Sequence, residues 1–205
     1  MTGLKVAVIL LAAGLSRRMG DRNKLLIEVR GEPLVRHTAK AYIAAGADVY
    51  AVLGHEAERV GAALADLRLT FVQNPNFADG QQTSVRAGLE ALAGDYDAVL
   101  VALSDQIALT SPDISDLLHA FAESSRDRIL IPYYKRERGN PVVFPAHVIA
   151  DIRASERNAA CRAFIDGNPE LTKRYEAAND HFVIDIDTPE DLHAFEVDGL
   201  KGTAA

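Results

Sequence analysis

The stretch VAVILLAAGLSRRMG, residues 6–20, decides the fold that the rest of the chain follows. Its first six residues are apolar without a break, which is typical of a strand buried on both faces of a parallel sheet. The polar loop after them contains Gly14 and the cations Arg17 and Arg18. A glycine-bearing loop with concentrated positive charge, placed directly after a buried strand, suits an anion such as phosphate.

The spacing of this loop excludes the common phosphate-binding motifs. Five residues separate Gly14 from Gly20, and Asp21 follows, so neither the Walker pattern nor the Gly-x-Gly-x-x-Gly fingerprint is present. Ser16 is followed two residues later by Arg18, which excludes the Gly-x-Ser-x-Gly elbow of the esterases. Because basic surface loops also follow strands, the loop alone does not decide between an anion site and an ordinary connection.

Length and composition favour one domain that acts on a small molecule. With 205 residues, 48% of them hydrophobic, we expect a single domain at 1–196 and a flexible tail at 197–205. The net charge of -7 argues against a nucleic acid or an anionic membrane as partner, because such binding needs a broad basic face. Cys161 is the only cysteine, so an intrachain disulfide is impossible and the cytoplasm is the expected compartment.

Patterns typical of strands and helices alternate along the first 132 residues, and this order favours a parallel sheet. Strands are expected at 25–29, 48–53, 69–72, 98–103 and 129–132, and helices at 33–46, 56–67 and after Gly80. Ser84 and Gly88 share one face of that last helix, because they lie four residues apart. Such a small-residue face fits either a ligand or close packing of the helix on the sheet.

The remaining third departs from strict alternation. The basic run 135–138 indicates a solvated hairpin tip, and residues 139–144 read as a return strand in which Pro141 suits an edge position. The alternation of residues 181–187 predicts a further strand with Asp185 and Asp187 on the same side. Residues 188–191 read as the start of a helix with a capping box.

Asp105 follows the second continuous apolar run, 98–103. Ligands of open parallel sheets lie beyond the carboxyl ends of the strands, so Asp105 and the Gly14 loop should meet if their strands are neighbours. A carboxylate there can hold Mg²⁺ against phosphate oxygens, and Asp185 and Asp187 are candidates to complete such a site. The alternative is that Asp105 serves only as a turn or cap residue.

Six motifs follow one another in a defined order along the chain. They are Leu11-Ala12-Ala13-Gly14-x-Ser16-x-Arg18-Met19-Gly20, Lys24-Leu25-Leu26, Gly80 with Ser84 and Gly88, Asp105-Gln106, Gly139 with Pro141, and Asp187-Thr188-Pro189-Glu190-Asp191. In this order they resemble the MobA-like nucleotidyltransferases, and among these the molybdenum cofactor cytidylyltransferases. The resemblance covers residues 6–192 and implies a Rossmann-like three-layer α/β/α fold with a mostly parallel sheet and one reversed strand.

The resemblance also implies a role for each matched residue. Nucleotide binding falls to Leu11, Ala12, Ala13, Gly14, Ser16, Arg18, Lys24, Ser84 and Asp105. Of these, Arg18, Lys24 and Asp105 are the implied catalytic residues, and the two cations hold the β- and γ-phosphates. The implied cofactor is Mg²⁺, bound by Asp105 and Asp187 with Asp185 as a further candidate. Asn140 stands where many members have histidine, in the half expected to meet the acceptor.

The activity implied by the resemblance is transfer of CMP from CTP to the phosphate of molybdopterin, with release of pyrophosphate. In cytidylyltransferases of the family the first strand ends in a sequence similar to Leu-Ala-Ala-Gly, which is also the sequence here. In guanylyltransferases the corresponding sequence is similar to Leu-Ala-Gly-Gly. A transient contact with a molybdoenzyme or its chaperone is implied as well. The alternatives are a transferase of the same fold that uses GTP or acts on a sugar phosphate or another phosphorylated metabolite, and a nucleotide-binding module without catalysis.

Overall fold

The computed structural model describes residues 2–16, 19, 22–154, 161–188 and 190–195. Arg17 and Arg18 of the basic loop lie outside the described residues, and so does the expected tail at 197–205. None of the helices within the described ranges is long and apolar enough to cross a membrane.

The centre of the molecule is a sheet with the strand order β10-β7-β9-β6-β1-β4-β5, with β8 paired to β7. Its strands are β1 (Val6–Ala12), β4 (Asp48–Leu53), β5 (Thr70–Gln73), β6 (Ala98–Leu103), β7 (Ile129–Tyr134), β8 (Glu137–Arg138), β9 (Val142–Pro145) and β10 (Thr172–Glu176). Strand β9 runs antiparallel to both of its neighbours, β6 and β7, and the short β8 is the returning arm of a hairpin. The other described pairings of this sheet are parallel, which confirms a mostly parallel sheet with one reversed strand.

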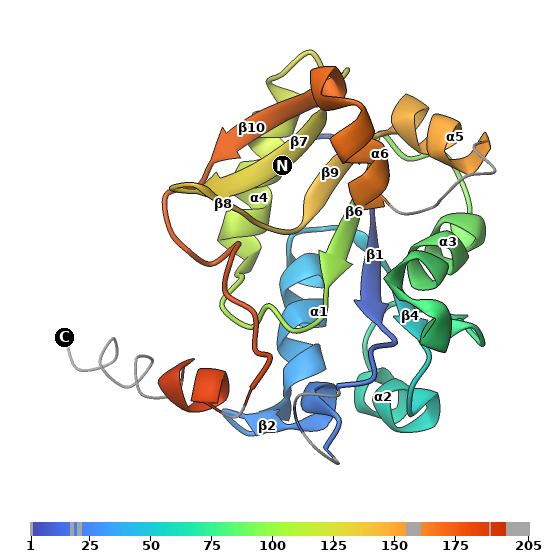
Figure 1. The fold of residues 1–205 in the computed structure, drawn as a ribbon, viewed down its shortest axis with the longest axis vertical. Helices are drawn as coiled ribbons and strands as arrows, with labels where there is room; N and C mark the ends of the chain where they lie inside the picture. The colour runs from blue at the N-terminus through green and yellow to red at the C-terminus, as the bar shows by residue number, and fades with distance from the viewer. Residues whose placement is uncertain (1, 17–18, 20–21, 155–160, 189, 196–205) are drawn as a thin grey trace.

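Helices cover both faces of this sheet (Figure 1). One layer consists of α1 (Leu34–Ala44), α2 (Ala57–Leu64) and α4 (Ser111–Ala122), and the other of α3 (Gln81–Ala91), α5 (Ala146–Ala154) and α6 (Cys161–Gly167). A small hairpin of β2 (Glu28–Val29) and β3 (Glu32–Pro33) and three 3₁₀ turns, Lys24–Leu26, Phe77–Asp79 and Pro169–Leu171, lie outside these two layers. Residues 190–195 are helical as well. The three-layer α/β/α prediction is confirmed.

The position of β1 between the two helix layers explains why its sequence is apolar without a break. Its even-numbered side chains pack beneath α1, α2 and α4, and its odd-numbered ones pack beneath α3. Because successive strand residues point to opposite faces, a strand covered on both sides needs an apolar residue at every position. Each valine, leucine or isoleucine of the strand contributes roughly 1.5 to 3 kcal/mol by its burial, so this strand anchors the core.

The reversed strand lies inside the sheet, not at its edge. We expected Pro141 to begin an edge strand, but β9 starts one residue later and lies between β6 and β7. The edge beyond β7 is formed by β10, which the sequence analysis did not predict. Strand β10 is mostly polar, because an edge strand over a partly covered face needs few apolar side chains.

Residues 181–187 form an irregular segment, so the expected strand is absent there. Its backbone is held by separate contacts: Ile186 N donates to Asp105 O at 3.1 Å, and Asn140 N donates to Phe182 O at 2.9 Å. Without the regular pleat of a strand, alternate residues need not share a side. The capping box after this segment is confirmed, since Asp191 N donates to Thr188 Oγ1 at 3.2 Å and Thr188 N donates to Asp191 Oδ2 at 2.8 Å.

Other element boundaries differ from the expectations by a few residues. The expected helix 56–67 is Ala57–Leu64, and the expected strand 25–29 is a 3₁₀ turn followed by the two-residue β2. That turn is capped by Asn23, whose Oδ1 accepts a hydrogen bond from Leu25 N at 3.1 Å. A side-chain cap of this kind competes with strand pairing and holds the chain in a turn.

Candidate active site

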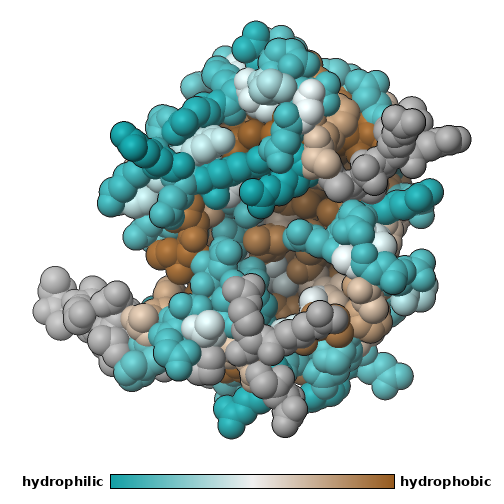
Figure 2. All heavy atoms as spheres, in the orientation of Figure 1, coloured by the Kyte–Doolittle hydropathy of each residue, from teal (hydrophilic) through white to brown (hydrophobic). Residues whose placement is uncertain are grey.

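A cavity of about 480 Å³ opens at the carboxyl ends of β1 and β6. These strands are neighbours, with Leu11 paired to Leu103, so the expected meeting of Asp105 with the Gly14 loop is confirmed. Figure 2 shows a hollow with a hydrophobic floor near the middle of this face, where β1 and β6 end in Figure 1. We call this the loop cavity, and its lining is Leu11, Ala13, Gly14, Leu15, Ser16, Lys24, Leu25, Phe77, Ala78, Gly80, Gln81, Ser84, Leu103, Ser104, Asp105 and Asp187.

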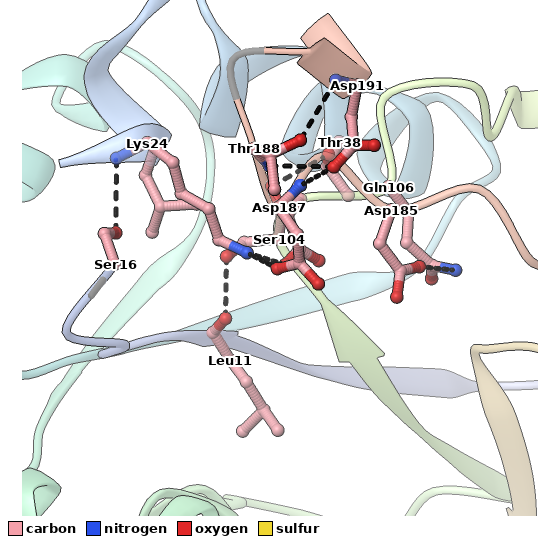
Figure 3. Close-up of polar contacts among 12 residues, drawn as sticks. Leu11, Ser16, Lys24, Thr38, Ser104, Gln106, Asp185, Asp187, Thr188 and Asp191 are labelled. Carbon is pink, nitrogen blue, oxygen red and sulfur yellow. Dashed lines mark hydrogen bonds and ion pairs between the residues drawn. The ribbon is translucent and has the colours of Figure 1, made fainter. Parts of the chain in front are cut away.

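Lys24 joins two carboxylates in this cavity. Its Nζ contacts Asp105 Oδ2. The same Nζ lies 2.8 Å from Asp187 Oδ1 (Figure 3). Burial alone would lower the pKa of the Lys24 ammonium, but the two carboxylates outweigh it and raise this pKa above its ordinary value. Lys24 is therefore a cation across the physiological range, and it brings residues 24, 105 and 187 together from distant parts of the chain.

The Asp185 side chain does not join the Lys24 cluster. Its Oδ1 accepts a hydrogen bond from Gln106 Nε2 at 3.4 Å, and the side chain does not line the loop cavity. Figure 3 shows it beside Gln106 and apart from the Lys24 ammonium. Although part of the residue is exposed, desolvation and the charges of Asp105 and Asp187 raise the pKa of its carboxyl to about 6. The expectation that Asp185 and Asp187 share one side is wrong, because the segment between them is not a strand.

The loop after β1 is shaped by Ser16. This residue has a φ of 50°, in the left-handed region that few non-glycine residues adopt. Its Oγ accepts a hydrogen bond from Lys24 N at 3.2 Å, so the loop folds back toward the turn that carries Lys24. A Cβ built on Gly14 would meet no protein atom within 4 Å, which leaves space at the loop for a ligand. Strained backbone of this kind is common where a ligand is held.

Ser104 locks the two strand ends together. Its buried Oγ donates to Leu11 O at 2.7 Å, and its own carbonyl oxygen accepts from Thr38 Oγ1 at 3.2 Å. Figure 3 shows the first of these bonds at the end of β1. The sequence analysis did not single out Ser104, whose only signal is its place beside Asp105. Its effect is to fix the distance between the loop and the Asp105 carboxylate.

The small-residue face of α3 packs closely on the sheet at Gly88 and lines the loop cavity at Ser84. Ser84 lines the loop cavity, and its Oγ accepts from Asn74 Nδ2 at 2.9 Å. Gly88, one turn further on, faces β1, because a Cβ there would lie 2.3 Å from Ile9 Cγ2. Close packing at Gly88 therefore lets α3 lie low enough for Ser84 to reach the cavity.

Phe77 forms a wall of the loop cavity that no sequence pattern indicated. It packs with Ala13 against Gly54, since a Cβ on Gly54 would lie 2.5 Å from Phe77 Cβ and 2.8 Å from Ala13 Cβ. Gly80 then begins α3 at a φ of 114°, which favours glycine. The amino end of α3 lies at the cavity, where its partial positive charge suits an anion.

The cavity contains most, but not all, of the residues that the sequence analysis assigned to a nucleotide. Ala12 belongs to the opposite core layer, because its side chain follows the strand alternation. Arg18 lies outside the described residues. Within the described ranges, no group of three or more His, Cys, Asp or Glu residues is arranged to hold a metal ion. Asp105, Asp185 and Asp187, the suggested metal ligands, therefore do not form such a group.

Comparisons with known proteins agree with this geometry. The family model described as the MobA-like NTP transferase domain matches residues 8–176. A probable molybdenum cofactor guanylyltransferase of Natronomonas pharaonis is 26% identical over 207 residues, which cover 90% of this chain and 93% of that protein. A nicotine blue oxidoreductase of Paenarthrobacter nicotinovorans is 28% identical over 200 residues, covering 92% and 95% of the two chains.

A solved structure shares the whole fold. A nucleotidyl transferase from Methanothermobacter thermautotroptrophicus superposes with a TM-score of 0.80 at 21% identity, and the match covers 98% of this chain and 99% of that one. The family model spans most of β1, the loop after it and the reversed strand β9. With its strand-end cavity and its lysine–carboxylate cluster, this chain is a nucleotidyltransferase-type protein that belongs to the MobA-like NTP transferase family.

Proposed function

We propose that this protein transfers CMP from CTP to the phosphate of molybdopterin and releases pyrophosphate. The observation that carries the proposal is the cluster of Lys24 with Asp105 and Asp187 inside the loop cavity. A cation and two carboxylates beside an anion-suited loop are what phosphoryl chemistry needs, because positioning and charge neutralisation carry most of such a reaction. No protein nucleophile is required.

The donor set fits a magnesium ion that arrives with its nucleotide. Asp105 Oδ1 is buried and has no hydrogen-bond partner among the described residues, where it is an acceptor without a donor. Magnesium is commonly bound by one or two carboxylates together with substrate phosphates, and Asp105 with Asp187 matches that number. When bound, the ion would supply charge neutralisation of the phosphates.

The protein's own groups divide the remaining work. The backbone of residues 13–16 and the amino end of α3 would hold the anionic part of the nucleotide. Lys24 would exchange its carboxylate partners for phosphate oxygens, and it would stabilise negative charge that moves toward the leaving pyrophosphate. An oxygen of the acceptor phosphate attacks the α-phosphorus as the bond to pyrophosphate breaks, so one P–O bond forms and one is lost.

The preference for CTP rests on Ala13. Ala13 lines the loop cavity, and its Cβ packs against Gly54, which is itself closed in by Phe77. The wall therefore has little room to yield to a larger purine. One methyl group in a pocket is worth only about 1 to 3 kcal/mol of discrimination, so the preference should be substantial but not absolute.

The test is pyrophosphate release with CTP, GTP, ATP or UTP, molybdopterin as acceptor, and Mg²⁺ or EDTA. We expect release with CTP that stops when EDTA removes the divalent ion. If no nucleotide gave pyrophosphate release, molybdopterin would be contradicted as the acceptor. A thermal-shift series with the same nucleotides and Mg²⁺ provides a check without turnover, because stabilisation grows with affinity. Stronger stabilisation by GTP than by CTP would show that the transferred group is guanylyl and not cytidylyl.

The alternatives make different predictions in these assays. A transferase for sugar phosphates would release pyrophosphate only with a sugar phosphate as acceptor, and a binding module would be stabilised by nucleotide without turnover. The relative named as an oxidoreductase shows that one family name covers more than one chemistry. The lysine–carboxylate cluster favours transfer, because neither plain binding nor hydride transfer needs a cation held between two carboxylates.

A further inference from the structure

Gln106 follows Asp105 directly and is fully buried, with 0% of the residue exposed. Its amide nitrogen Nε2 donates to Phe182 O at 2.9 Å and to Asp185 Oδ1 at 3.4 Å. Both acceptors belong to the irregular segment 181–187, and Figure 3 shows the contact with Asp185. One side chain just beyond β6 therefore holds this segment at two points. Gln106 does not line the loop cavity, so it would act through its neighbours and not by touching a ligand.

The orientation of the Gln106 amide follows from its partners. A backbone carbonyl oxygen such as Phe182 O can only accept, so the amide nitrogen must face it. In this orientation the amide oxygen Oε1 is buried and has no hydrogen-bond partner among the described residues. A buried acceptor without a donor is unfavourable. The structure keeps the two bonds to the irregular segment although the amide oxygen stays unpaired.

The carbonyl oxygen of Phe182 is a junction of three segments. It accepts from Gln106 Nε2 and from Asn140 N, each at 2.9 Å. A Cβ on Gly139 would lie 2.4 Å from the same oxygen, so the chain just before β9 packs directly on it. The Phe182 ring is buried and meets the Tyr175 ring of β10, with the ring centroids 5.9 Å apart. The first part of the irregular segment is therefore fixed to β6, β9 and β10.

The far end of the irregular segment is held at the loop cavity. Ile186 N donates to the backbone oxygen of Asp105 at 3.1 Å, and Asp187 Oδ1 lies 2.8 Å from the Lys24 ammonium. Asp185 lies between the two held ends, and its carboxylate is turned to the amide described above. Because carboxylates at close range repel one another, turning Asp185 aside lets Asp187 alone join Asp105.

We propose that Gln106 is a positioning residue that holds Asp187 in the proposed magnesium site and keeps Asp185 out of it. This inference rests on the proposed nucleotidyl transfer and names the group that selects its second carboxylate. The amide acts through the backbone: with Phe182 O and Asp185 held, the short step to Asp187 has little freedom to bring a different side chain to Lys24. Removal of a group that orients a metal ligand typically weakens metal binding by about 10- to 100-fold.

The test compares the binding of CTP with and without the divalent ion. Calorimetry on the full chain gives the Kd of CTP once in Mg²⁺ and once in EDTA, and we expect tighter binding in Mg²⁺ for the wild type. Gln106→Met keeps an unbranched side chain of similar length but removes the donor. It should weaken CTP in Mg²⁺ by about 10-fold or more and leave binding in EDTA unchanged. The matched control, Gln73→Met, is at an exposed position that does not line the loop cavity and should change neither value.

Unfolding in urea separates positioning from general structural support. In Gln106→Met the Phe182 oxygen keeps its bond from Asn140 N, and the unpaired Oε1 is removed. The urea midpoint should therefore stay close to that of the wild type. A purely structural role would lower this midpoint and weaken CTP equally in Mg²⁺ and in EDTA, and that result would overturn the assignment.

A second pair of variants does not depend on how well Gln106→Met folds. Asp187→Asn should remove most of the gain in CTP affinity that Mg²⁺ brings, whereas Asp185→Asn should keep most of it, because its amide oxygen can still accept from Gln106. A larger loss in Asp185→Asn than in Asp187→Asn would overturn the proposed selection. If Gln106→Met keeps the full gain from Mg²⁺, this inference fails alone; if no nucleotide binds to the wild type, the proposed function fails.

Discussion

The loop cavity and a second cavity of about 440 Å³ between α3 and α6, which we call the α3–α6 cavity, have lining residues in common but are built in different ways. The first takes much of its lining from one continuous motif, residues 11–16, and from the end of the neighbouring parallel strand. The second is assembled from α3, β6, the reversed strand β9, α6 and the irregular segment after Phe182. A cavity lined largely by one local motif can be recognised from the sequence, whereas a cavity assembled from several elements depends on contacts between distant segments.

The largest expected effect tests the chemistry on the loop side. Asp105→Ala should lower kcat by about 10³-fold or more, because it removes a carboxylate from the Lys24 cluster and the expected magnesium site. Pyrophosphate release measures this loss. The protein should stay folded, since it is the backbone oxygen of Asp105 that accepts the bond from Ile186 N. Asp95→Ala, at an exposed position, is the control, and near wild-type turnover in Asp105→Ala would refute the metal assignment.

The next effect separates phosphate binding from base binding. Lys24→Ala should weaken triphosphate by about 1.5 to 3 kcal/mol, the cost of a lost charge-assisted contact, and change monophosphate little. Calorimetry with CTP and CMP decides it. The matched control is Lys40→Ala, which removes a lysine paired with Glu32 away from both cavities. Equal losses for the two nucleotides would instead indicate that Lys24 only holds the loop in shape. We expect the same pattern for Arg18→Ala.

A third effect concerns the attachment of the irregular segment. Asp113, in the capping box of α4, accepts hydrogen bonds from Asn179 Nδ2 at 2.8 Å and from His181 Nδ1 at 2.9 Å. Asp113→Ala should cost about 1 to 3 kcal/mol of the free energy of unfolding at pH 7, measured in urea. Asp116→Ala, exposed on the same helix, should cost little. A loss as small as that of the control would show that the segment needs no such tether.

The pH dependence of that loss follows from the pKa of Asp113. Burial would raise this pKa, but the hydrogen bonds from Asn179, Thr110 and His181 outweigh it and leave the pKa below its ordinary value. The pKa of this carboxyl is lower in the folded protein than in the unfolded chain, where it is near 4. Such a group stabilises the folded protein at any pH above its pKa in the unfolded chain, and this contribution is lost as the pH falls through its pKa in the folded protein. The difference between wild type and Asp113→Ala should therefore narrow below about pH 4. A constant difference would rule out the charged form as the cause.

The smallest expected effect concerns the base. Ala13→Gly should reduce the preference for CTP over GTP by about 1 kcal/mol, because it removes one methyl group from the cavity wall. Competition between the two nucleotides in the pyrophosphate assay measures the shift. An unchanged ratio would place base selection at other positions, with Phe77 the first to examine.

Periodicity predicted the parallel half of the fold well. The strands Asp48–Leu53 and Ala98–Leu103 have the expected bounds, and Gly46 follows α1 at a φ of 85°, as a C-cap glycine should. The reversed half was harder, because β9 is apolar enough for either an inner or an edge strand, and β10 has too few apolar residues to be recognised. Strand order depends on pairing between distant segments, which local patterns do not specify.

By itself the sequence determined the buried strand β1, the loop after it and the placement of Asp105 just beyond a second buried strand, because burial on both faces and strand-end loops leave a local signature. The tertiary structure decided that these two strands are neighbours. Only the tertiary structure decided that Lys24 lies between Asp105 and Asp187 and that Asp185 faces the other cavity. The physical reason is that residues 181–187 lack a pleat, so each side chain is oriented by its contacts with remote groups such as Gln106.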